Sequence, residues 1–234
     1  MRLTGVSSGN VELDGLVGTG YPRRMMSQIY GEPGSGKSTL CIMAAVSVLK
    51  QGETVVYFDT ESFSAERFSQ IAGDEAELLA DRLILYEPTD FNQQGMMILE
   101  SEKVIQENKA GIIILDSATG LYRTELEHIQ ETLQKFNRQM TILLGYAKRY
   151  DIPVLISNQV YMDISKGDFA PLGGTGLYHL CKIILQIERR DNTRRIRVVK
   201  HHAQPEGTYI DVTLVQEGIR IIDSYPEDSW TGKS

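Results

Sequence analysis

The stretch Gln28-Ile29-Tyr30-Gly31-Glu32-Pro33-Gly34-Ser35-Gly36-Lys37-Ser38-Thr39 decides the fold. Its residues 31–38 match the eight-residue pattern Gly-x-x-x-x-Gly-Lys-Ser of a phosphate-binding loop. Residues 27–30 are predicted to form a short strand before the loop, and residues 37–50 have the apolar spacing of a helix that ends before Gly52. In this setting the backbone N–H groups of the loop surround phosphates, and the helix start adds positive potential. We therefore predict a binding site for ATP with Mg²⁺.

The residues of the loop have expected roles at that site. Lys37 is expected to reach the β- and γ-phosphates, and the hydroxyl of Ser38 is the expected Mg²⁺ ligand. Asp116 follows the wholly apolar run 111–115, where a carboxylate would lie beside the loop and hold Mg²⁺ through water. The candidate nucleotide ligands are Gly31, Glu32, Pro33, Gly34, Ser35, Gly36, Lys37, Ser38 and Thr39.

Apolar runs predict further strands, and helical apolar spacing predicts helices. The predicted strands are 54–58, 83–86, 111–115, 154–157, 183–188, 195–200, 207–215 and 219–222, and the predicted helices are 64–72, 92–109 and 124–150. The stretch 160–176 is rich in Gly, Asp and Pro and is predicted to be a long loop. This order favours an α/β fold with a central, mostly parallel sheet that is flanked by helices and continued by antiparallel C-terminal strands.

The composition is that of an intracellular globular protein. The 234 residues suffice for one α/β domain, which we place at 1–223, ahead of a polar tail at 224–234. A net charge of −7 excludes a protein that is basic throughout, so nucleic acid would have to bind at local patches. Cys41 and Cys181 have apolar neighbours and are expected to be buried thiols. Since the sequence contains no signal peptide or membrane span, we expect a cytoplasmic protein.

Polar side chains at two further strand ends are candidates for the chemistry of ATP. Glu61 follows the strand 54–58, where a carboxylate can orient the attacking water, and Asp59 is its rival. Gln159 follows the strand 154–157, where an amide could sense the γ-phosphate and influence the stretch after it. Ordinary structural roles are the alternatives, a helix cap for Glu61 and a satisfied polar residue for Gln159.

Taken together, these motifs resemble the RecA-type recombinases, in particular their archaeal and eukaryotic branch. The resemblance rests on residues 28–38, 59–61, 116–117 and 157–160, and it extends over about residues 3–222. It implies a RecA-like core of the phosphate-loop NTPase type. It also implies that Glu61 is the catalytic carboxylate and that Gln159 couples ATP to a DNA-binding loop.

The same resemblance assigns roles to residues outside the phosphate loop. Arg67 would stack on the adenine. Residues 117–125 and 160–176 match the two DNA-binding loops of the family, with Arg123 and Lys166 as their candidate phosphate contacts. Pro205, in Pro205-Glu206-Gly207, would cap the ATP of a neighbouring subunit.

Departures from the family pattern favour an accessory role. The second loop contains Asp163, Lys166 and Asp168, so its charge of about −1 is poor for binding phosphates. Recombinases of this family have a longer first loop with more arginines, and an aromatic polymerisation contact ahead of the core. The start of this chain at the core domain resembles a short archaeal paralogue of the family.

One dense basic segment contains Arg189, Arg190, Arg194, Arg195, Arg197 and Lys200. Arg195 and Arg197 alternate with apolar residues and are therefore expected to share one strand face, where they would contact a DNA backbone. A hairpin with a solvated, charged tip is the alternative. Lys200 could also reach the γ-phosphate of a neighbouring subunit, as an arginine finger does.

Three functions fit these residues. The first is an ATP- and Mg²⁺-dependent DNA-binding protein that assists homologous recombination and DNA repair, with single-stranded DNA and the main recombinase as partners and slow or absent ATP hydrolysis. The second is a DNA-dependent ATPase that performs strand exchange itself, and the third is a signalling ATPase of the clock-protein type. We favour the first, leave assembly into a homo-oligomer open, and expect no membrane partner.

Overall fold

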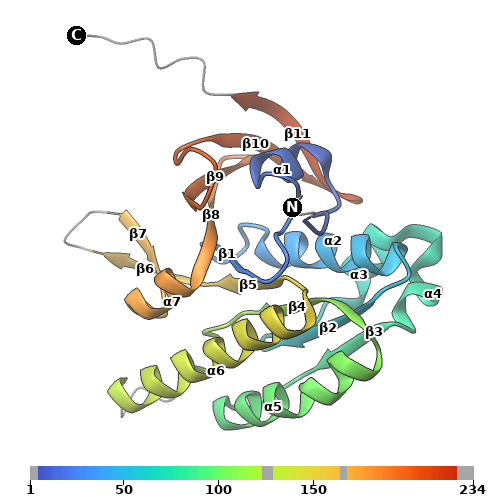
Figure 1. Cartoon of the computed structure of the whole chain (residues 1–234). Helices are drawn as coiled ribbons and strands as arrows, with labels where there is room; N and C mark the ends of the chain where they lie inside the picture. Colours follow the sequence, from blue (N-terminus) through green and yellow to red (C-terminus); the bar gives the residue numbers. More distant parts are fainter. Residues whose placement is uncertain (1–4, 123–128, 164–167, 226–234) are drawn as a thin grey trace.

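The structure, a computed structural model, describes residues 5–122, 129–163 and 168–225. Its main feature is a nine-stranded sheet with helices on both faces (Figure 1). The strands of this sheet are β1 (Met26–Gly31), β2 (Thr54–Asp59), β3 (Leu83–Tyr86), β4 (Ala110–Asp116), β5 (Val154–Asn158), β8 (Cys181–Arg190), β9 (Thr193–His201), β10 (Tyr209–Val215) and β11 (Gly218–Tyr225). Two further strands, β6 (Val160–Asp163) and β7 (Asp168–Pro171), form a separate two-stranded sheet. The helices are α1 (Val11–Leu16), α2 (Lys37–Lys50), α3 (Ala65–Ala72), the 3₁₀ turn η1 (Gly73–Glu75), α4 (Ala76–Ala80), α5 (Phe91–Glu107), α6 (Ile129–Tyr150) and α7 (Gly174–Leu180).

The strand order in the sheet is β11-β10-β9-β8-β1-β5-β4-β2-β3. Every neighbouring pair from β8 to β3 is parallel, whereas β9, β10 and β11 extend the β8 edge as antiparallel strands. The predicted α/β class, with a mostly parallel sheet and antiparallel C-terminal strands, is confirmed. Because parallel strands end at the same edge of a sheet, β1, β2, β4 and β5 bring the polar residues that follow them to one place.

The central strands are buried because helices cover both faces of the sheet. Every residue of β1, β2, β4 and β5 is buried, which explains the apolar runs in β2, β4 and β5. Helices α1 to α4 contribute to the hydrophobic cluster on one face, and α5, α6 and α7 contribute to the cluster on the other. The two clusters therefore hold the sheet between two helical layers.

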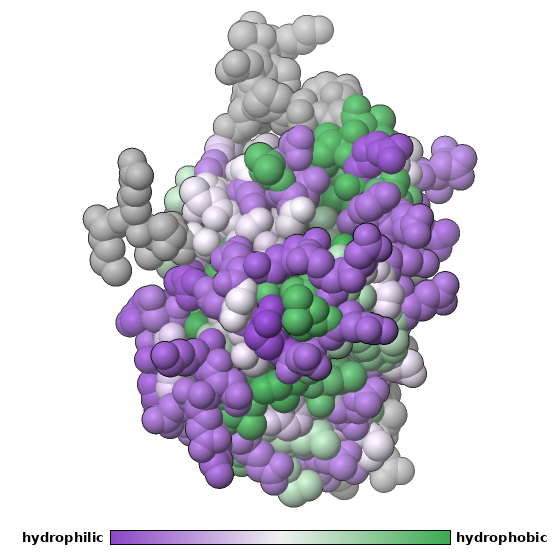
Figure 2. Space-filling model, turned by 90° about the vertical axis from the view of Figure 1, so that its right-hand side faces the viewer, coloured by the Kyte–Doolittle hydropathy of each residue, from purple (hydrophilic) through white to green (hydrophobic). Residues whose placement is uncertain are grey.

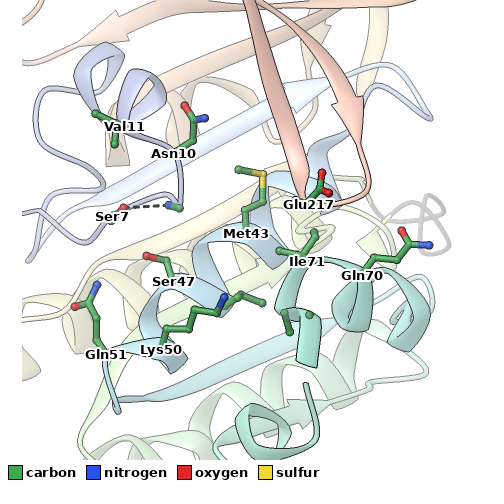
Figure 3. A pocket seen from close by; sticks show the side chains of 14 residues that line it. Ser7, Asn10, Val11, Met43, Ser47, Lys50, Gln51, Gln70, Ile71 and Glu217 are labelled. Atoms are coloured by element: carbon green, nitrogen blue, oxygen red, sulfur yellow. Dashed lines mark hydrogen bonds between the residues drawn. The ribbon is translucent and has the colours of Figure 1, made fainter. Parts of the chain in front are cut away.

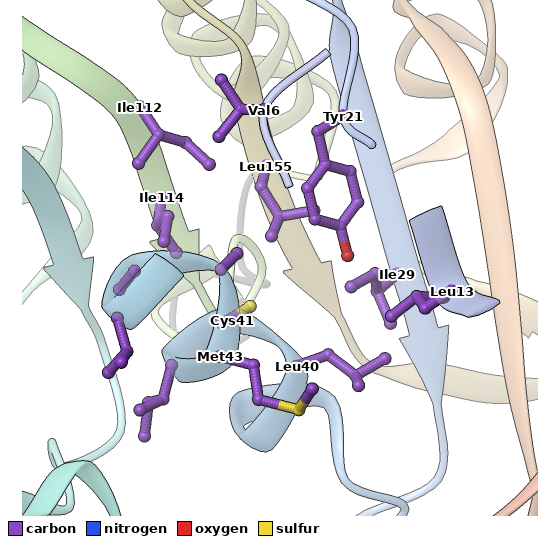
Figure 4. Packing of buried hydrophobic residues seen from close by; sticks show 14 of the residues in the cluster. Val6, Leu13, Tyr21, Ile29, Leu40, Cys41, Met43, Ile112, Ile114 and Leu155 are labelled. Carbon is purple, nitrogen blue, oxygen red and sulfur yellow. The ribbon is translucent and has the colours of Figure 1, made fainter. Parts of the chain in front are cut away.

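Helix α2 lies at the centre of the first cluster. Figure 4 shows Leu40, Cys41 and Met43 of this helix among residues of α1 and the sheet, such as Leu13 and Ile114. Cys41 and Cys181 are both buried free thiols, as predicted. Since α2 carries the phosphate loop at its N-terminus, this close packing positions the loop against the ends of the strands.

The stretch 160–176 differs from the predicted long loop. It contains the hairpin of β6 and β7 and the first turn of α7, while residues 164–167 lie outside the described part. Gly173, at φ +105°, is the N-cap of α7, so a glycine that suggested a loop begins a helix instead. The prediction was wrong because β6 and β7 pair with each other, and composition does not reveal such pairing.

The ends of several elements also differ from the prediction. The helix predicted at 124–150 is described from Ile129 on, and residues 123–128 lie outside the described part. Strand β11 includes the first two residues of the predicted polar tail, and residues 226–234 are not described. The short helices α1 and α4 were not predicted, because six and five residues are too few for a periodic apolar pattern. The assignment of 1–223 to a single domain stays a prediction.

Polar residues dominate the face of the molecule seen in Figure 2, where hydrophobic residues form patches separated by hydrophilic ones. Large apolar side chains that are exposed include Val11, Leu78, Met96 and Leu99. Within the described ranges, no helix is both long enough and apolar enough to cross a membrane.

A buried hydrogen bond between α5 and α6 provides a test of the second helical layer. Gln94 is 0% exposed, and its Nε2 donates to Oε1 of Gln139 at 2.8 Å. We expect Gln139→Ala to remove this partner from a buried amide and to lower the free energy of unfolding by about 1–3 kcal/mol. Chemical denaturation measures the loss. Gln134→Ala, at an exposed position of α6, is the matched control, and an equal effect of both substitutions would contradict the role of the buried pair.

Candidate nucleotide-binding site

The phosphate loop joins β1 to α2, and two of its glycines have a steric reason. A Cβ on Gly31 would lie 2.5 Å from the carbonyl oxygen of Ile187 in the neighbouring strand β8. Gly36 has φ +108° and directly precedes Lys37, the first residue of α2. The chain can therefore make the tight turn by which such loops present N–H groups at the start of a helix.

A cavity of about 350 Å³ lies against this loop. It is lined by Pro33, Gly34, Gly36, Lys37, Ser38, Thr39, Glu61, Asp116, Ser117, Gln159 and Leu214. The structure thus brings the predicted phosphate-loop residues together with Glu61, Asp116 and Gln159 from three different strand ends. Leu214, near the end of β10, was not predicted at this site. Nothing in its local sequence marks it, because only the antiparallel extension of the sheet brings β10 here.

Lys37 is buried at the base of the cavity, with 8% of its surface exposed. Its Nζ donates to the carbonyl oxygens of Gly31 at 2.9 Å and Glu32 at 3.0 Å. Burial lowers the pKa of the ammonium, and the carboxylates of Glu61 and Asp116 act in the opposite direction. The ammonium is therefore held at the loop by backbone carbonyl oxygens, and its positive charge can help to neutralise a bound anion.

Asp116 is held by two hydroxyl groups at the end of β4. The carboxylate is 4% exposed, Tyr57 donates to its Oδ2 at 2.9 Å, and Ser157 donates to its Oδ1. Burial raises the pKa of Tyr57, and the charge of Asp116 raises it further, so the phenol stays protonated and serves as a donor. Asp116 lines the same cavity as Ser38, which suits the pair for a shared Mg²⁺ ion.

Two buried hydroxyl groups near the loop test whether a nucleotide fits. The Oγ atoms of Ser35 and Ser117 are buried without a hydrogen-bond partner among the residues that the structure describes. Ser117 lines the cavity beside Lys37. Buried polar groups normally have partners, so these hydroxyls, together with Lys37 and Asp116, fit an oxygen-rich ligand such as the phosphates of ATP with Mg²⁺.

Glu61 and Gln159 contact each other across the cavity. Nε2 of Gln159 donates to Oε1 of Glu61, and both side chains line the cavity beside Lys37. The rival carboxylate, Asp59, is 7% exposed and lines a smaller adjoining cavity, which Glu61 and Asp116 also line, but it does not line the cavity beside Lys37. The geometry therefore favours Glu61 over Asp59 as the group that faces the phosphates.

Hydrogen bonds connect the end of β5 to the segment that follows this strand. Thr119 donates from Oγ1 to Oδ1 of Asn158, and Nδ2 of Asn158 donates to the carbonyl oxygen of Leu172. The N–H of Leu172 in turn donates to the carbonyl oxygen of Gln159 at 3.1 Å. Gln159, which precedes the β6–β7 hairpin and lines the cavity, is thus hydrogen-bonded to Leu172, which follows the hairpin.

Sequence reasoning gave Tyr57 no role at the site, and it did not foresee the contacts of Thr119, Ser157 and Asn158, although these three lie in segments that match the family. Each of them is a polar residue in or just after a buried strand, which is the signal that could have found them. Their partners lie 14 to 59 residues away in sequence, so no local pattern indicated which groups they would bind.

Arg67, which we expect to stack on adenine, is hydrogen-bonded within the chain. Its guanidinium donates hydrogen bonds to the carbonyl oxygens of Val215, Gln216 and Gly218. The side chain still lines a cavity next to Thr39. The N–H groups of Arg67 thus bind the turn between β10 and β11, and its stacking on adenine stays a prediction.

Most of the basic segment is paired within the chain. Nε and Nη2 of Arg195 donate to the two carboxylate oxygens of Asp211, and the guanidinium lies 3.5 Å from the ring centre of Tyr209. Arg197 lies 3.1 Å from a carboxylate oxygen of Glu188. Carboxylates therefore offset both charges, and the DNA contacts of Arg195 and Arg197 stay predictions.

Lys200 and Pro205 are not among the residues that line the cavity of their own chain. Nζ of Lys200 donates to the carbonyl oxygen of Tyr178 at 2.6 Å. In the sheet, Lys200 of β9 lies opposite Ile184, in the middle of β8. Pro205 is exposed between β9 and β10. Their contacts with the ATP of a neighbouring subunit stay predictions, as do the DNA contacts of Arg123 and Lys166, which lie outside the described residues.

Comparison with known proteins decides the family. The model of the Rad51 family matches residues 1–222. The chain belongs to the Rad51 family. This membership confirms the resemblance to RecA-type recombinases that the motifs predicted. Members of the Rad51 family bind nucleotides, which agrees with the phosphate loop.

Individual members of the Rad51 family match over nearly the whole chain. The DNA repair and recombination protein RadB of Methanoculleus marisnigri is 52% identical over 95% of this chain and 100% of its own length. The protein of the same name from Methanococcoides burtonii is 40% identical over 89% of this chain and 94% of its own. A crystal structure of the RadB recombinase superposes with a TM-score of 0.79 at 33% identity, covering 92% of this chain and 98% of that one. The RecA-like fold is thereby confirmed.

Asp59 gives the site a testable pH dependence. Burial, reinforced by the nearby charge of Asp116, raises the pKa of Asp59 from 3.8 to about 7. Between pH 4 and pH 7 the folded protein therefore keeps a proton that the unfolded chain has lost, so the contribution of Asp59 to stability falls as pH rises and stays unfavourable above pH 7. We expect Asp59→Asn to raise the Tm by about 5 °C at pH 8 and to change it little at pH 4.

Thermal unfolding at several pH values measures this effect. Asp74→Asn, at an exposed position, is the control and should give the same small Tm difference at every pH. If the stabilisation by Asp59→Asn were as large at pH 4 as at pH 8, the raised pKa of Asp59 would not be its cause.

Proposed function

We propose that this protein uses ATP with Mg²⁺ as a switch for DNA binding in homologous recombination and DNA repair, in an accessory role beside the main recombinase. The observation that carries the proposal is the hydrogen bond between Gln159 and Glu61 in the cavity of the phosphate loop. Gln159 directly precedes the β6–β7 hairpin, which matches the second DNA-binding loop. A γ-phosphate near Glu61 would compete with its carboxylate for the side-chain amide of Gln159. A change at Gln159 would then alter the start of the hairpin.

The residues of the cavity have distinct roles in this proposal. Lys37 and the loop N–H groups bind the phosphates, and Ser38 and Asp116 would hold Mg²⁺. The ion neutralises charge on the β- and γ-phosphates when it is bound. Glu61 orients water for a slow hydrolysis that resets the switch.

The charges of the chain support an accessory role over strand exchange. Arg195 and Arg197 are paired with carboxylates, and the second loop is weakly acidic by sequence. Affinity for DNA comes mainly from unpaired cations that contact phosphates. The names of the relatives, DNA repair and recombination protein RadB, support the process in which the protein acts.

A DNA-dependent strand-exchange ATPase is the second candidate, because Lys37, Ser38, Glu61 and Asp116 form a complete set for hydrolysis in one cavity. In that function Arg123 and Lys166 would contact DNA, and Lys200 and Pro205 would contact the ATP of the next subunit. A signalling ATPase of the clock-protein type would need neither DNA-binding loop, and so neither Arg123 nor Lys166 as a DNA contact.

Measurements of ATP turnover and DNA binding separate these functions. We expect the protein to bind single-stranded DNA more tightly with ATP and Mg²⁺ than without, with affinity that falls as salt rises and turnover that DNA changes little. Strong stimulation of turnover by DNA would favour the strand-exchange enzyme. If DNA does not bind even at low salt, both recombination functions fail.

The role of Lys37 can be tested in the same assays. We expect Lys37→Ala to weaken ATP binding roughly 10- to 150-fold, because a charged hydrogen-bonding group is lost from the phosphates, and to abolish the effect of ATP on DNA binding. Lys103→Ala is the control, since Lys103 is a largely exposed lysine of α5. Unchanged ATP affinity in the Lys37 variant would contradict the phosphate-binding role.

Gln159 gives a sharper test of the switch. We expect Gln159→Ala to keep ATP affinity within about threefold, because one neutral hydrogen bond contributes little net free energy, and yet to make DNA affinity independent of ATP. Fluorescence anisotropy with labelled single-stranded DNA measures the second effect. A variant that loses ATP binding and the switch together would assign Gln159 to nucleotide binding alone.

A further inference from the structure

Thr60 joins the ends of β2 and β4 through both its main chain and its side chain. Its N–H donates to the carbonyl oxygen of Asp116 at 2.8 Å. Its Oγ1 donates to the carbonyl oxygen of Ser117 at 2.8 Å and accepts the N–H of Ser117 at 3.1 Å. Since Asp59 and Asp116 are the last residue pair of these two strands, the hydroxyl of Thr60 continues the connection one residue beyond the sheet.

The turn 117–120 packs closely against this hydroxyl. A Cβ on Gly120 would lie 2.4 Å from Oγ1 of Thr60, which is too close for any non-bonded contact. The backbone of Gly120 does not have a positive φ, so its conformation alone does not require glycine. The N–H of Gly120 donates to the carbonyl oxygen of Ser117 at 3.0 Å, the same oxygen that Thr60 binds. Thr60 and the turn therefore fit together as one packed unit.

This turn is the start of the segment 117–125, which matches the first DNA-binding loop. Its other side is fixed to the end of β5, where the N–H of Ala118 donates to the carbonyl oxygen of Ser157 at 2.8 Å. Thr119 donates from Oγ1 to the side chain of Asn158. The turn is thus held between two strand ends, and Thr60 provides the side-chain contact on the β2 side.

The contact also joins two residues of the nucleotide cavity. Glu61, which follows Thr60 in the chain, lines this cavity, and so does Ser117. Thr60 itself is not among the lining residues. The Oγ of Ser117 is buried without a hydrogen-bond partner among the described residues, so it is available to an oxygen of a bound phosphate. A ligand that binds at Glu61 or Ser117 would therefore act on the turn through the hydroxyl of Thr60.

We propose that Thr60 is a positioning residue that couples the first candidate DNA-binding loop to the phosphate site. The proposal rests on the proposed function, in which ATP controls DNA binding. Thr60 holds Ser117 beside Glu61, so that the start of this loop responds to a γ-phosphate, as the β6–β7 hairpin does through Gln159. DNA that contacts both loops needs both connections, and loss of either one removes the effect of ATP. The coupling is reciprocal, because DNA must change ATP affinity by the same factor as ATP changes DNA affinity.

Thr60→Val tests the coupling, since valine has nearly the shape of threonine and lacks the hydroxyl. Fluorescence anisotropy measures the affinity for labelled single-stranded DNA with and without ATP and Mg²⁺, and titration calorimetry measures the affinity for ATP without DNA. We expect ATP to tighten DNA binding at least about 5-fold in the wild type and less than about 2-fold in Thr60→Val. DNA affinity without ATP and ATP affinity without DNA should both stay within about twofold, because only the link between the sites is lost.

Two further variants are controls for the loss of the hydroxyl. Thr60→Ser keeps this group and should keep the coupling of the wild type. Ser47→Ala removes a half-buried hydroxyl from a groove of about 700 Å³ between α1, α2 and α3, and it should also leave the coupling unchanged. Figure 3 shows Ser47 among the residues of this groove, which shares no lining residue with the cavity beside Lys37.

Gly120→Ala tests the contact with Thr60 by an independent route. The added Cβ collides with Oγ1 of Thr60, so we expect the coupling to fall as in Thr60→Val and the Tm to fall by about 5 °C. In Thr60→Ala this oxygen is absent, and the nearest remaining atom is 3.3 Å from the added Cβ. Gly120→Ala should therefore lower the Tm of Thr60→Ala by less than about 2 °C, because the two substitutions remove one shared contact.

The possible outcomes separate the role of Thr60 from the proposed function. Full coupling in Thr60→Val would overturn the proposal, as would equal losses of Tm from Gly120→Ala in both backgrounds. A Thr60→Val protein that loses DNA affinity equally with and without ATP would assign Thr60 to the structure of the loop alone and would also overturn it. A wild type whose DNA affinity does not depend on ATP would instead show that the proposed function itself is wrong.

Discussion

The hydrogen bonds of the buried Lys37 ammonium to the phosphate loop are the interaction on which the rest of the site depends. A buried cation must be hydrogen-bonded or paired, and the carbonyl oxygens of Gly31 and Glu32 bind it while Glu61 and Asp116 offset its lost hydration. This arrangement requires the loop to close tightly at the start of α2. It also requires the strand ends that carry the carboxylates to lie beside the loop. The parallel order of the central strands meets both requirements, because their carboxyl ends share one edge.

Two polar connections lead from this centre to the periphery. One passes from Glu61 through Gln159 to the β6–β7 hairpin, whose ends are tied by Asn158 and Leu172. The other passes from α3 through Arg67 to the turn of the antiparallel strands. Both connect an element next to the phosphate loop with a segment that is distant in sequence. Two segments that are distant in sequence are therefore hydrogen-bonded to residues that line the candidate site or the cavity next to it.

Much of the fold could be predicted because β2, β4 and β5 are buried on both faces and contain apolar runs, while β1 was marked by the phosphate loop that follows it. The positions of Asp116, Glu61 and Gln159 followed from the same logic, since each follows such a run. The spacing of residues alone left Glu61 and Asp59 as alternatives, because both lie near the end of β2; the family resemblance favoured Glu61, and the structure places Glu61 but not Asp59 in the cavity beside Lys37. The hairpin within 160–176 was missed because its short strands pair only with each other.

By itself, the sequence determined the phosphate loop, the α/β class and the residues at the carboxyl ends of the strands, because these features depend on local backbone requirements and on burial. Only the tertiary structure decided what the charged side chains do. Arg195 pairs with Asp211, and Arg67 binds the turn that begins at Val215, although both looked like ligand contacts in the sequence. The reason is physical: a cationic side chain binds the oxygen atoms that the fold places near it. Strand pairing and helix packing bring these oxygen atoms close from residues that are distant in the sequence.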